Sequence, residues 1–478
     1  MLDSARCMEN REYYRRFIRF CASRNLNTIL WHFSDDQGVS MDFPSEPGLA
    51  GKHAYSSEEM SELISYAEDR GITIIPELET LGHSRYITGH AHYQHLCESD
   101  GDFTAMCPIH PDTRSLMKRL LADVAAIFPS PWIHVGLDEI KLGGHPLTQE
   151  ALATKCVAEL LLDYVTFIYD EVTALSRQMI MWVDQNSFDA GFIHGLSREI
   201  ILAVWQYNPD VKPDLAQRLI DDGFSVILCP AMITYDQQAY PGNIALPNIE
   251  RMSRYQQLCG NGKVMGALTT IWTPMRYLHD ALWPALGIAA DTMLSQGRLD
   301  APQSVAKHIR EFHGVEPDPL IVEAITFSFE IAPERKEYLS VLKADPNELD
   351  EHLLVRRSKE WAQISDHISS FLPRVKREYA SIETLKLFAA WMSYLYRRSA
   401  LLKARGLSRE AWEKLTEEGG KWLGKLEQIW DRERFADDHR RFSPVFGWEE
   451  NEYLLINFRQ SLQVTEAQLP HDLVPSHS

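Results

Sequence analysis

An eight-stranded parallel β/α barrel of the α/β class, followed by an α-helical region, is the fold that the sequence predicts. Two observations predict it. Short apolar runs alternate with helix-like segments up to about residue 300, and long, charge-laced helical segments follow without such runs. Continuous apolar runs suit strands that are buried on both faces of a parallel sheet. We therefore expect a (β/α)8 TIM-type barrel over residues 1–300 and a helical C-terminal domain over residues 301–478.

The predicted strands are apolar runs rich in β-branched residues, and they leave room for a helix between successive strands. They lie at 27–33, 72–78, 132–137, 179–183, 199–205, 225–229 and 264–271. A barrel of this class needs eight strands. The candidate for the remaining strand is 1–3, directly before the first helix. It is too short for a whole strand, so we expect the chain as given to begin inside a truncated first strand.

The predicted helices are segments with apolar residues at helical spacing. In segment 9–24, for example, Tyr13, Phe17, Phe20 and Cys21 follow the i, i+3, i+4 pattern. Further helical segments of the barrel are predicted at 57–70, 112–127, 149–177 and 279–296. Those of the C-terminal domain are predicted at 301–312, 349–380, 382–404, 408–429 and 447–464.

Composition narrows the classes of partner. The 478 residues carry a net charge of −19, which argues against nucleic acid and anionic membranes as partners. No apolar run approaches the roughly 20 residues that span a bilayer, and the first residues lack the apolar segment of a signal peptide. Seven cysteines without CxxC spacing suggest free thiols and favour a cytoplasmic location, although a Cys229–Cys259 pair stays open.

Unusual polar and aromatic residues stand where the predicted strands end. The run WIHVGLDEIK closes a strand with two adjacent acids, Asp138 and Glu139. In a β/α barrel, active sites lie at the carboxyl ends of the strands. Acids beside aromatic rings suit the binding of sugars, because rings stack on pyranose faces and carboxylates accept hydrogen bonds from hydroxyls. The other strand-end candidates are Arg6, Asp35, Glu79, His83, His134, Trp182, Trp205, Tyr235 and Trp272.

The adjacency of the two acids constrains the mechanism. A retaining glycosidase usually holds its two carboxyl groups about 5–5.5 Å apart on either side of the anomeric carbon. Neighbouring residues of a strand point to opposite faces, so Asp138 and Glu139 are poorly placed for that task. They suit separate tasks if the chain bends after Gly136. One acid protonates the leaving oxygen, and the other holds a part of the substrate that itself attacks.

Four collinear motifs resemble glycoside hydrolase family 20, the β-N-acetylhexosaminidases. The family's His-x-Gly-Gly-Asp-Glu motif resembles residues 134–139, and its Asp-x-Ala-Arg resembles residues 3–6. Its Trp-His-x-x-Asp-Asp-Gln segment resembles residues 31–37, and its Pro-Glu-x-Asp-x-Pro-Gly-His segment resembles residues 76–83. The resemblance covers about residues 1–290 and does not include the helical tail.

The resemblance implies an exo-acting enzyme in which the 2-acetamido oxygen of the substrate attacks its own anomeric carbon. Asp138 would orient the acetamide, and Glu139 would be the general acid and then the base. We expect a raised pKa for Glu139 from nearby Asp138 and a partly dry pocket. His83 would be oriented by Glu79 or Asp35. The implied substrate-binding residues are Arg6, Asp35, His83, His134, Trp182, Trp205, Tyr235 and Trp272, with Tyr235 on the acetamide oxygen. Neither a metal nor another cofactor is implied.

The chain departs from the family pattern in four places. Leu137 replaces the second glycine of the core motif, Leu81 replaces a proline, and Glu79 replaces an aspartate. The family's Trp-x-Glu after strand eight reads Trp272-Thr273-Pro274. This last departure leaves open whether gluco or galacto sugars are preferred. Arg276 or a residue of the helical tail is the candidate substitute for the missing glutamate.

Two rival interpretations stay open. The first is a non-catalytic sugar-binding protein on a barrel derived from a hydrolase. The second is a metal-dependent hydrolase, because His83, His90, His92 and His95 lie close together in the sequence and histidine is a frequent metal ligand. For the helical domain we expect a cover on the barrel that shapes the outer subsites or a homodimer contact. The expected partner is a carbohydrate with terminal N-acetylglucosamine or N-acetylgalactosamine.

Overall fold

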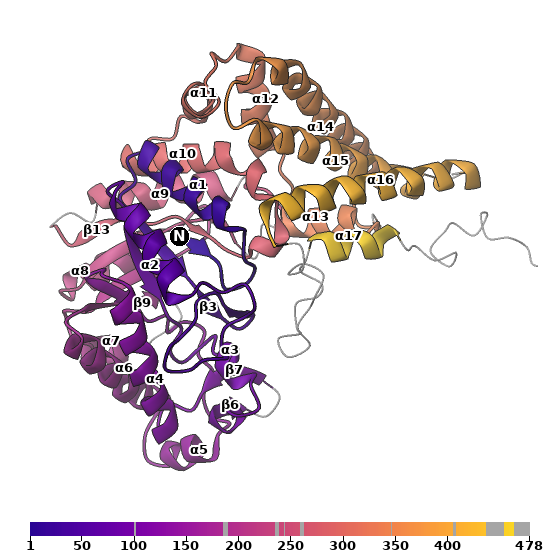
Figure 1. Ribbon diagram of the computed structural model, residues 1–478. Helices are drawn as coiled ribbons and strands as arrows, with labels where there is room; N and C mark the ends of the chain where they lie inside the picture. The colour runs from indigo at the N-terminus through magenta and orange to yellow at the C-terminus, as the bar shows by residue number, and fades with distance from the viewer. Residues whose placement is uncertain are drawn as a thin grey trace, which may run out of the picture.

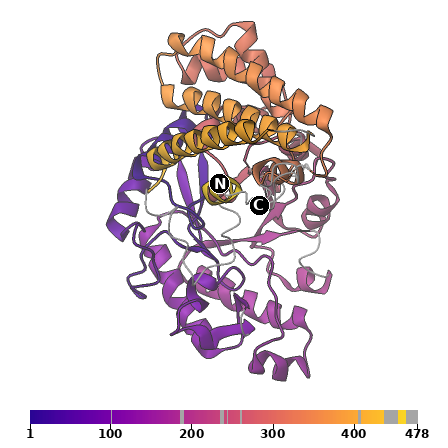
Figure 2. The ribbon, with the colours of Figure 1, turned by 90° about the vertical axis from the view of Figure 1, so that its right-hand side faces the viewer.

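A curled sheet of eight parallel strands is the centre of the fold (Figures 1 and 2). The computed structural model describes residues 1–99, 102–184, 190–234, 239–242, 244–258, 262–345, 347–404, 408–435 and 454–462. Along the sheet, the strands lie in chain order: β1 (Leu2–Asp3), β2 (Thr28–His32), β5 (Thr73–Glu77), β8 (Trp132–His134), β9 (Gln178–Val183), β10 (Ile201–Trp205), β11 (Ser225–Cys229) and β13 (Val264–Ala267). The predicted barrel class is confirmed.

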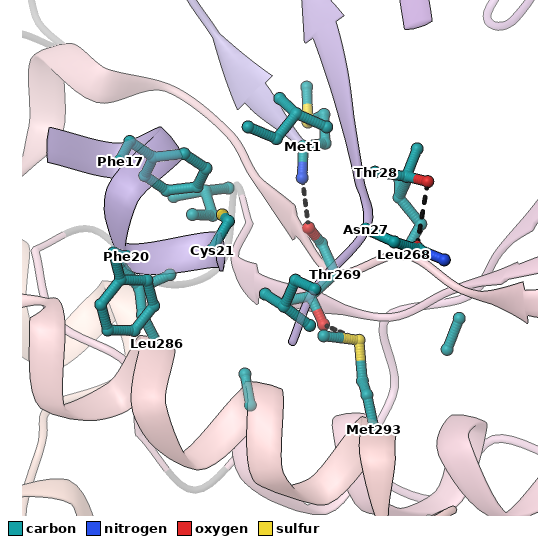
Figure 3. A pocket seen from close by; sticks show the side chains of 15 residues that line it. Met1, Phe17, Phe20, Cys21, Asn27, Thr28, Leu268, Thr269, Leu286 and Met293 are labelled. Carbon is teal, nitrogen blue, oxygen red and sulfur yellow. Dashed lines mark hydrogen bonds between the residues drawn. The ribbon is translucent and has the colours of Figure 1, made fainter. Parts of the chain in front are cut away.

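The first and last strands approach each other and complete the barrel. The amino group of Met1 donates a hydrogen bond of 2.8 Å to the carbonyl of Thr269, as Figure 3 shows. Beyond β13, the eighth strand continues as β14 (Thr270–Ile271), which pairs in parallel with β12 (Ala231–Ile233). The barrel interior is filled by apolar side chains from several strands, namely Met1, Leu30, Ile75, Ile180, Ile201, Ala203 and Cys229.

Helices cover the outside of the sheet (Figure 2). They are α1 (Arg11–Ser23), α2 (Ser57–Glu68), α4 (Pro111–Ile127), α6 (Val157–Ala174), α7 (Ala190–Gly195), α8 (Asp214–Asp221), α9 (Ala245–Leu258) and α10 (Trp283–Leu294). One prediction was wrong in detail. Segment 149–177 holds two helices, because α5 (Pro146–Leu152) ends before Cys156, whose backbone N–H donates to the Glu159 carboxylate at the start of α6.

Short excursions leave the barrel at the carboxyl ends of the second and third strands. After β2 the chain forms the hairpin of β3 (Ser34–Asp35) and β4 (Gly38–Val39). After β5 it forms α3 (Arg85–Thr88) and a hairpin of β6 (Cys97–Ser99) and β7 (Asp102–Met106). Figure 1 places β6, β7 and α5 at the end of the molecule farthest from the later helices.

In the described part of the chain after residue 300, the regular elements are helices. The helices are α11 (Ala301–Phe312), α12 (Pro319–Glu330), α13 (Arg335–Leu342), α14 (Glu351–Phe371), α15 (Tyr379–Lys403), α16 (Arg409–Glu433) and α17 (Leu454–Leu462). Helices α12 and α13 were not predicted. Helix α12 buries Ile321, Ala324, Ile325, Ser328 and Phe329 on one face. The helices after 300 gather on one side of the barrel (Figures 1 and 2).

Two further sequence inferences concern membranes and thiols. Among the helices of the described ranges, none combines the length and the apolar character needed to cross a bilayer. The described cysteines, Cys7, Cys21, Cys97, Cys107, Cys156 and Cys229, are free thiols. Cys259 lies outside the described residues, so the Cys229–Cys259 pair is not addressed.

A small cavity of about 100 Å³ lies beside Met1, between α1, α10 and the strands (Figure 3). It is lined mainly by apolar side chains, among them Phe17, Phe20, Leu286 and Met293. None of the strand-end candidates lines this cavity. It belongs to the packing between the helices and the barrel wall.

Candidate active site

The carboxyl ends of four neighbouring strands bring acids and imidazoles into one row. The strand register pairs Asp3 with His32, His32 with Glu77, and Glu77 with His134. All four residues are buried. Acid and base therefore alternate across the strand ends, so that each charge has an opposite neighbour.

Ion pairs connect this row. The His32 imidazole lies 2.8 Å from Asp35 through Nε2 and 3.0 Å from Glu77 through Nδ1. Burial opposes a charge on His32, but Glu77 and Asp35 raise its pKa well above the ordinary value. Burial also opposes a charge on Glu77. The imidazoles of His32 and His134 nevertheless hold the Glu77 pKa below its usual value, helped by the indole N–H of Trp182. His134 itself stays neutral, because burial lowers its pKa to about 4.

Arg6 connects the first and second strand ends. Its guanidinium donates to Asp3 at 2.8 Å and to Asp35 at 2.7 Å. Its Cζ atom lies 5.2 Å from the ring centroid of Trp272, within the range of a cation–π contact. The Arg6 side chain is 12% exposed, so the cation reaches the rim while two carboxylates fix its direction.

A sharp turn after β8 separates the two adjacent acids. Gly136, Leu137 and Glu139 have φ angles of +67°, +76° and +49°. The left-handed conformation costs a residue with a side chain about 1–2 kcal/mol. At Leu137 a fully buried side chain offsets this cost, since burying a leucine is worth about 1.5–3 kcal/mol. The turn leaves the Asp138 side chain 16% exposed and the Glu139 side chain 65% exposed.

His83 joins both acids to the second strand end. Its Nε2 atom lies 3.8 Å from Asp138 and 3.5 Å from Glu139. Its Nδ1 atom hydrogen-bonds Asp36 at 3.2 Å and lies 3.6 Å from Asp35. Although burial opposes a charge, Asp35 and Asp138 raise the His83 pKa well above its ordinary value. The His83 imidazole thus lies between the two adjacent acids that follow β8 and the two adjacent aspartates that follow β2.

The two adjacent acids titrate in the order opposite to the one we expected. Contact with His83 lowers the Glu139 pKa, so the expectation of a raised value was wrong for the ligand-free chain. Burial instead raises the pKa of Asp138 to about 6. The physical reason is exposure: Glu139 keeps most of its water, whereas Asp138 is almost enclosed.

Glu79 is a buried acid with a raised pKa. Burial, and then the nearby carboxylate of Asp138, raise the pKa of Glu79 well above its usual value. Its backbone N–H donates to the Ser34 hydroxyl at 2.9 Å. The Nδ1 atom of His83 hydrogen-bonds Asp36. Asp35, one of the two residues expected to orient His83, lies 3.6 Å from the same Nδ1 atom, and Asp36 is the additional partner.

Tryptophan side chains stand above the acidic row. Trp182 contacts the ring of His134 at 4.3 Å and that of Trp272 at 6.0 Å between centroids. The Trp272 indole donates to the hydroxyl of Tyr207 at 2.8 Å, and Tyr207 lies 5.2 Å from Trp205. The predicted residue Tyr235 lies outside the described residues.

Side chains of the types that can ligate a metal form three compact groups among the described residues. They are His32 with Glu77 and Glu79, His83 with Asp35 and Asp36, and His95 with His110 and Asp112. His83 and His95 thus belong to different groups, and His90 and His92 belong to none of them. The four histidines behind the metal-dependent alternative do not come together as one ligand set in the described structure.

Sequence reasoning assigned no role to five residues of this region: Asp3, His32, Asp36 and Glu77, which stand in the motifs quoted above, and Tyr207. The first four flank predicted strand ends, so the signal was present. What the sequence lacked was the register, which places Asp3, His32 and Glu77 side by side. Tyr207 follows the sixth strand by two residues, and its contact with Trp272 joins segments far apart in the chain.

A parallel β/α barrel with acids, an imidazolium and tryptophans at the carboxyl ends of its strands has the architecture of a barrel glycoside hydrolase. Comparison with known families agrees. Residues 1–294 match the catalytic domain of glycosyl hydrolase family 20, and the chain belongs to this family.

Curated relatives and solved structures are similar to the same part of the chain. A β-hexosaminidase of Vibrio furnissii is 29% identical over 273 residues, which are 49% of this chain and 43% of that protein. The human β-hexosaminidase subunit beta is 27% identical over 225 residues, or 43% of this chain and 39% of that protein. The chain thus matches less than half the length of these relatives.

Two crystal structures share the fold. The exo β-N-acetylglucosaminidase of Vibrio harveyi in complex with N-acetylglucosamine has a TM-score of 0.52 at 22% identity, covering 65% of this chain and 56% of that one. The Flavobacterium johnsoniae chitobiase has a TM-score of 0.54 at 16% identity, covering 87% of this chain and 74% of that one.

Proposed function

We propose that the chain is an exo-acting β-N-acetylhexosaminidase that removes terminal N-acetyl-β-D-hexosamines with retention of configuration. Membership of family 20 and the similarity to β-hexosaminidases support a glycoside substrate. The observation that carries the proposal is the pair Asp138 and Glu139, two adjacent acids of unlike exposure that meet one imidazole. This pair suits a mechanism in which the two carboxyl groups have different tasks.

Asp138 is suited to hold the attacking group of the substrate. Its Oδ1 atom is buried and, among the described residues, accepts no hydrogen bond. The N–H of a 2-acetamido group would satisfy that oxygen and turn the acetamide oxygen towards the anomeric carbon. Ionised Asp138 would also stabilise the positive charge that develops on the acetamide. Such an intramolecular nucleophile has an effective concentration of about 10⁵–10⁸ M.

Glu139 is suited to move the proton. As the acetamide oxygen bonds to the anomeric carbon, the glycosidic bond breaks and Glu139 protonates the leaving oxygen. The Glu139 carboxylate then takes a proton from the water that opens the oxazolinium ring, which gives net retention. A bound sugar would remove water from Glu139, which is 65% exposed in the free chain. The loss of water would raise the Glu139 pKa towards the value that an acid needs.

The decisive experiment compares aryl β-glycosides with and without the acetamide. The proposal expects turnover of the N-acetyl-β-D-glucosaminide or N-acetyl-β-D-galactosaminide and none of the unacetylated β-D-glucoside. A chito-oligosaccharide should lose single sugars from its non-reducing end. Equal hydrolysis with and without the acetamide would contradict the assisted mechanism. Sugar binding without turnover would favour the non-catalytic alternative, and loss of activity in a chelator would favour the metal-dependent one.

A further inference from the structure

Two consecutive residues at the end of α16, Glu433 and Arg434, lie buried against the barrel. The Arg434 side chain is fully enclosed, and the Glu433 side chain is 2% exposed. Through Nη2, Arg434 donates to the carbonyl oxygens of Pro274 at 2.7 Å and Tyr277 at 2.8 Å. Through Nη1 it pairs with Glu433 at 2.9 Å.

Glu433 holds the same barrel loop at its other end. Its two carboxylate oxygens accept the backbone N–H groups of His279, at 2.9 Å, and Asp280, at 3.0 Å. Together, Glu433 and Arg434 therefore satisfy four main-chain groups of the loop that follows the eighth strand. Unpaired buried polar groups of this kind cost stability, so the loop conformation depends on these two side chains.

The loop that follows the first strand meets the same two residues. The backbone N–H of Asn10 donates to the carbonyl of Glu433 at 3.0 Å, and Glu9 forms an isolated antiparallel bridge with Arg434. The Glu9 carboxylate also hydrogen-bonds the His279 imidazole. The end of α16 thus lies against two barrel loops that are about 270 residues apart in the sequence.

These two loops carry candidate sugar contacts. Arg6 belongs to the loop after the first strand, and Trp272 stands at the start of the loop after the eighth. Between them, the Thr273 N–H donates to Asp3 at 3.0 Å, and Asp3 accepts from Arg6 at 2.8 Å. Thr273 has a left-handed φ of +60°. A backbone in such a conformation persists only where its surroundings hold it.

We propose that Glu433 and Arg434 are positioning residues that the helical region contributes to the sugar site. By fixing the main chain from Pro274 to Asp280, they set the position of Thr273, and through Asp3 the direction of Arg6 beneath Trp272. This inference rests on the proposed function, because it assigns Arg6 and Trp272 to the substrate. It gives the helical region a role in sugar binding in place of a simple cover.

The test compares Arg434→Met with Arg398→Met in the full chain. Arg398 is a matched control, because it is equally buried and its Nη2 donates to two carbonyls, Val341 at 3.0 Å and Leu342 at 2.7 Å, inside the helical region. Both changes should lower the melting temperature. Arg434→Met should also raise KM for an aryl N-acetyl-β-D-glucosaminide, and Ki for N-acetylglucosamine, about tenfold or more, with a smaller change in kcat.

Two further variants refine the result. Arg434→Lys should restore part of the affinity, because an ammonium reaches one of the two carbonyls. Glu433→Gln, which keeps the side-chain volume, should raise KM in the same direction and provides a second test if Arg434→Met does not fold. Equal KM values in Arg434→Met and Arg398→Met would overturn the proposal, since they would reduce Arg434 to a stabilising residue.

A measurement without turnover separates this proposal from the proposed function. Hydrogen–deuterium exchange by mass spectrometry should show faster exchange over residues 1–10 and 270–282 in Arg434→Met than in the parent and in Arg398→Met. Unchanged exchange in both segments would overturn the positioning role. If the parent hydrolysed no N-acetyl-hexosaminide, the proposed function would fail, and the exchange rates together with calorimetric binding of N-acetylglucosamine would still decide whether Arg434 positions the loops.

Discussion

The carboxyl group of Glu79 packs directly on Gly136, so closely that a Cβ atom at position 136 would lie 1.9 Å from Oε2 of Glu79. Gly136 also has a φ of +67°. It is the glycine that precedes the two candidate catalytic acids by two and three residues. The absence of a side chain at this position therefore allows both the turn of the backbone and the approach of a buried acid to Asp138.

Gly136→Ala should lower kcat/KM by about a hundredfold, because displacing Glu79 shifts the turn, and a misplacement near 1 Å costs about that much. Gly71→Ala is the matched control. Gly71 has a similar φ of +73°, but a Cβ there would meet nothing within 4 Å. Both variants bear a conformational cost of about 1–2 kcal/mol, which thermal unfolding measures. Equal kcat/KM in the two variants would show that the contact with Glu79 has no bearing on activity.

Replacing either buried glutamate of the third strand end by glutamine should give opposite results. The Glu79 pKa is raised by burial and by Asp138, which favours the neutral acid, so Glu79→Gln should change the unfolding free energy by only about 1 kcal/mol. The Glu77 pKa is lowered, so Glu77→Gln removes a buried charge that His32 needs and should cost about 3–5 kcal/mol. Urea unfolding at pH 7 measures both values, and equal losses would contradict the two assigned protonation states.

The pH dependence of kcat/KM should have an acidic optimum. The active form needs ionised Asp138 and protonated Glu139, that is, one proton on the pair. Below the lowered Glu139 pKa both acids are protonated, and above the Asp138 pKa of about 6 both are ionised. Activity should therefore fall on both sides, with the alkaline midpoint near pH 6.

The profile of kcat is a separate test of the bound state. A bound sugar should raise the Glu139 pKa by removing water, so the alkaline midpoint of kcat should lie at higher pH than that of kcat/KM. In Asp138→Asn the midpoint near pH 6 should be absent from the residual activity. A kcat/KM that rises through pH 6 to a plateau above pH 7 would contradict the assignment.

The sequence predicted the strands well because most are continuous apolar runs, buried over most of their length. It predicted the candidate acids because these stand at strand ends. It did not predict the row of Asp3, His32, Glu77 and His134, which exists only through the register of neighbouring strands. The lowered Glu139 pKa was likewise out of reach, since it depends on His83, a contact set by a turn some 56 residues earlier in the chain and by exposure.

The helical region shows the same limit. Its long amphipathic helices were predicted from their stripes, but the shorter α12 and α13 were not predicted. Arg434 is an ordinary charge at a helix end when read locally. Its structural role is to donate hydrogen bonds to the carbonyls of Pro274 and Tyr277, which lie 160 and 157 positions away in the sequence. Local sequence patterns therefore predict helices and strands, whereas the contacts between distant segments are seen only in the structure.

Glu139→Gln should lose more activity on substrates whose leaving group needs a proton than on substrates whose leaving group departs as a stable anion. A glutamine cannot protonate the leaving oxygen, and general acid catalysis is worth about 10²–10⁴ in rate. The loss in kcat/KM should be near the top of that range for an N-acetyl disaccharide and much smaller for an aryl glycoside, whose phenolate leaves without a proton. Asp138→Asn should instead impair both substrates alike, because the acetamide must attack in either case. Parallel kinetics of both variants on both substrates measure these ratios, and equal losses for Glu139→Gln on the two leaving groups would exclude Glu139 as the acid.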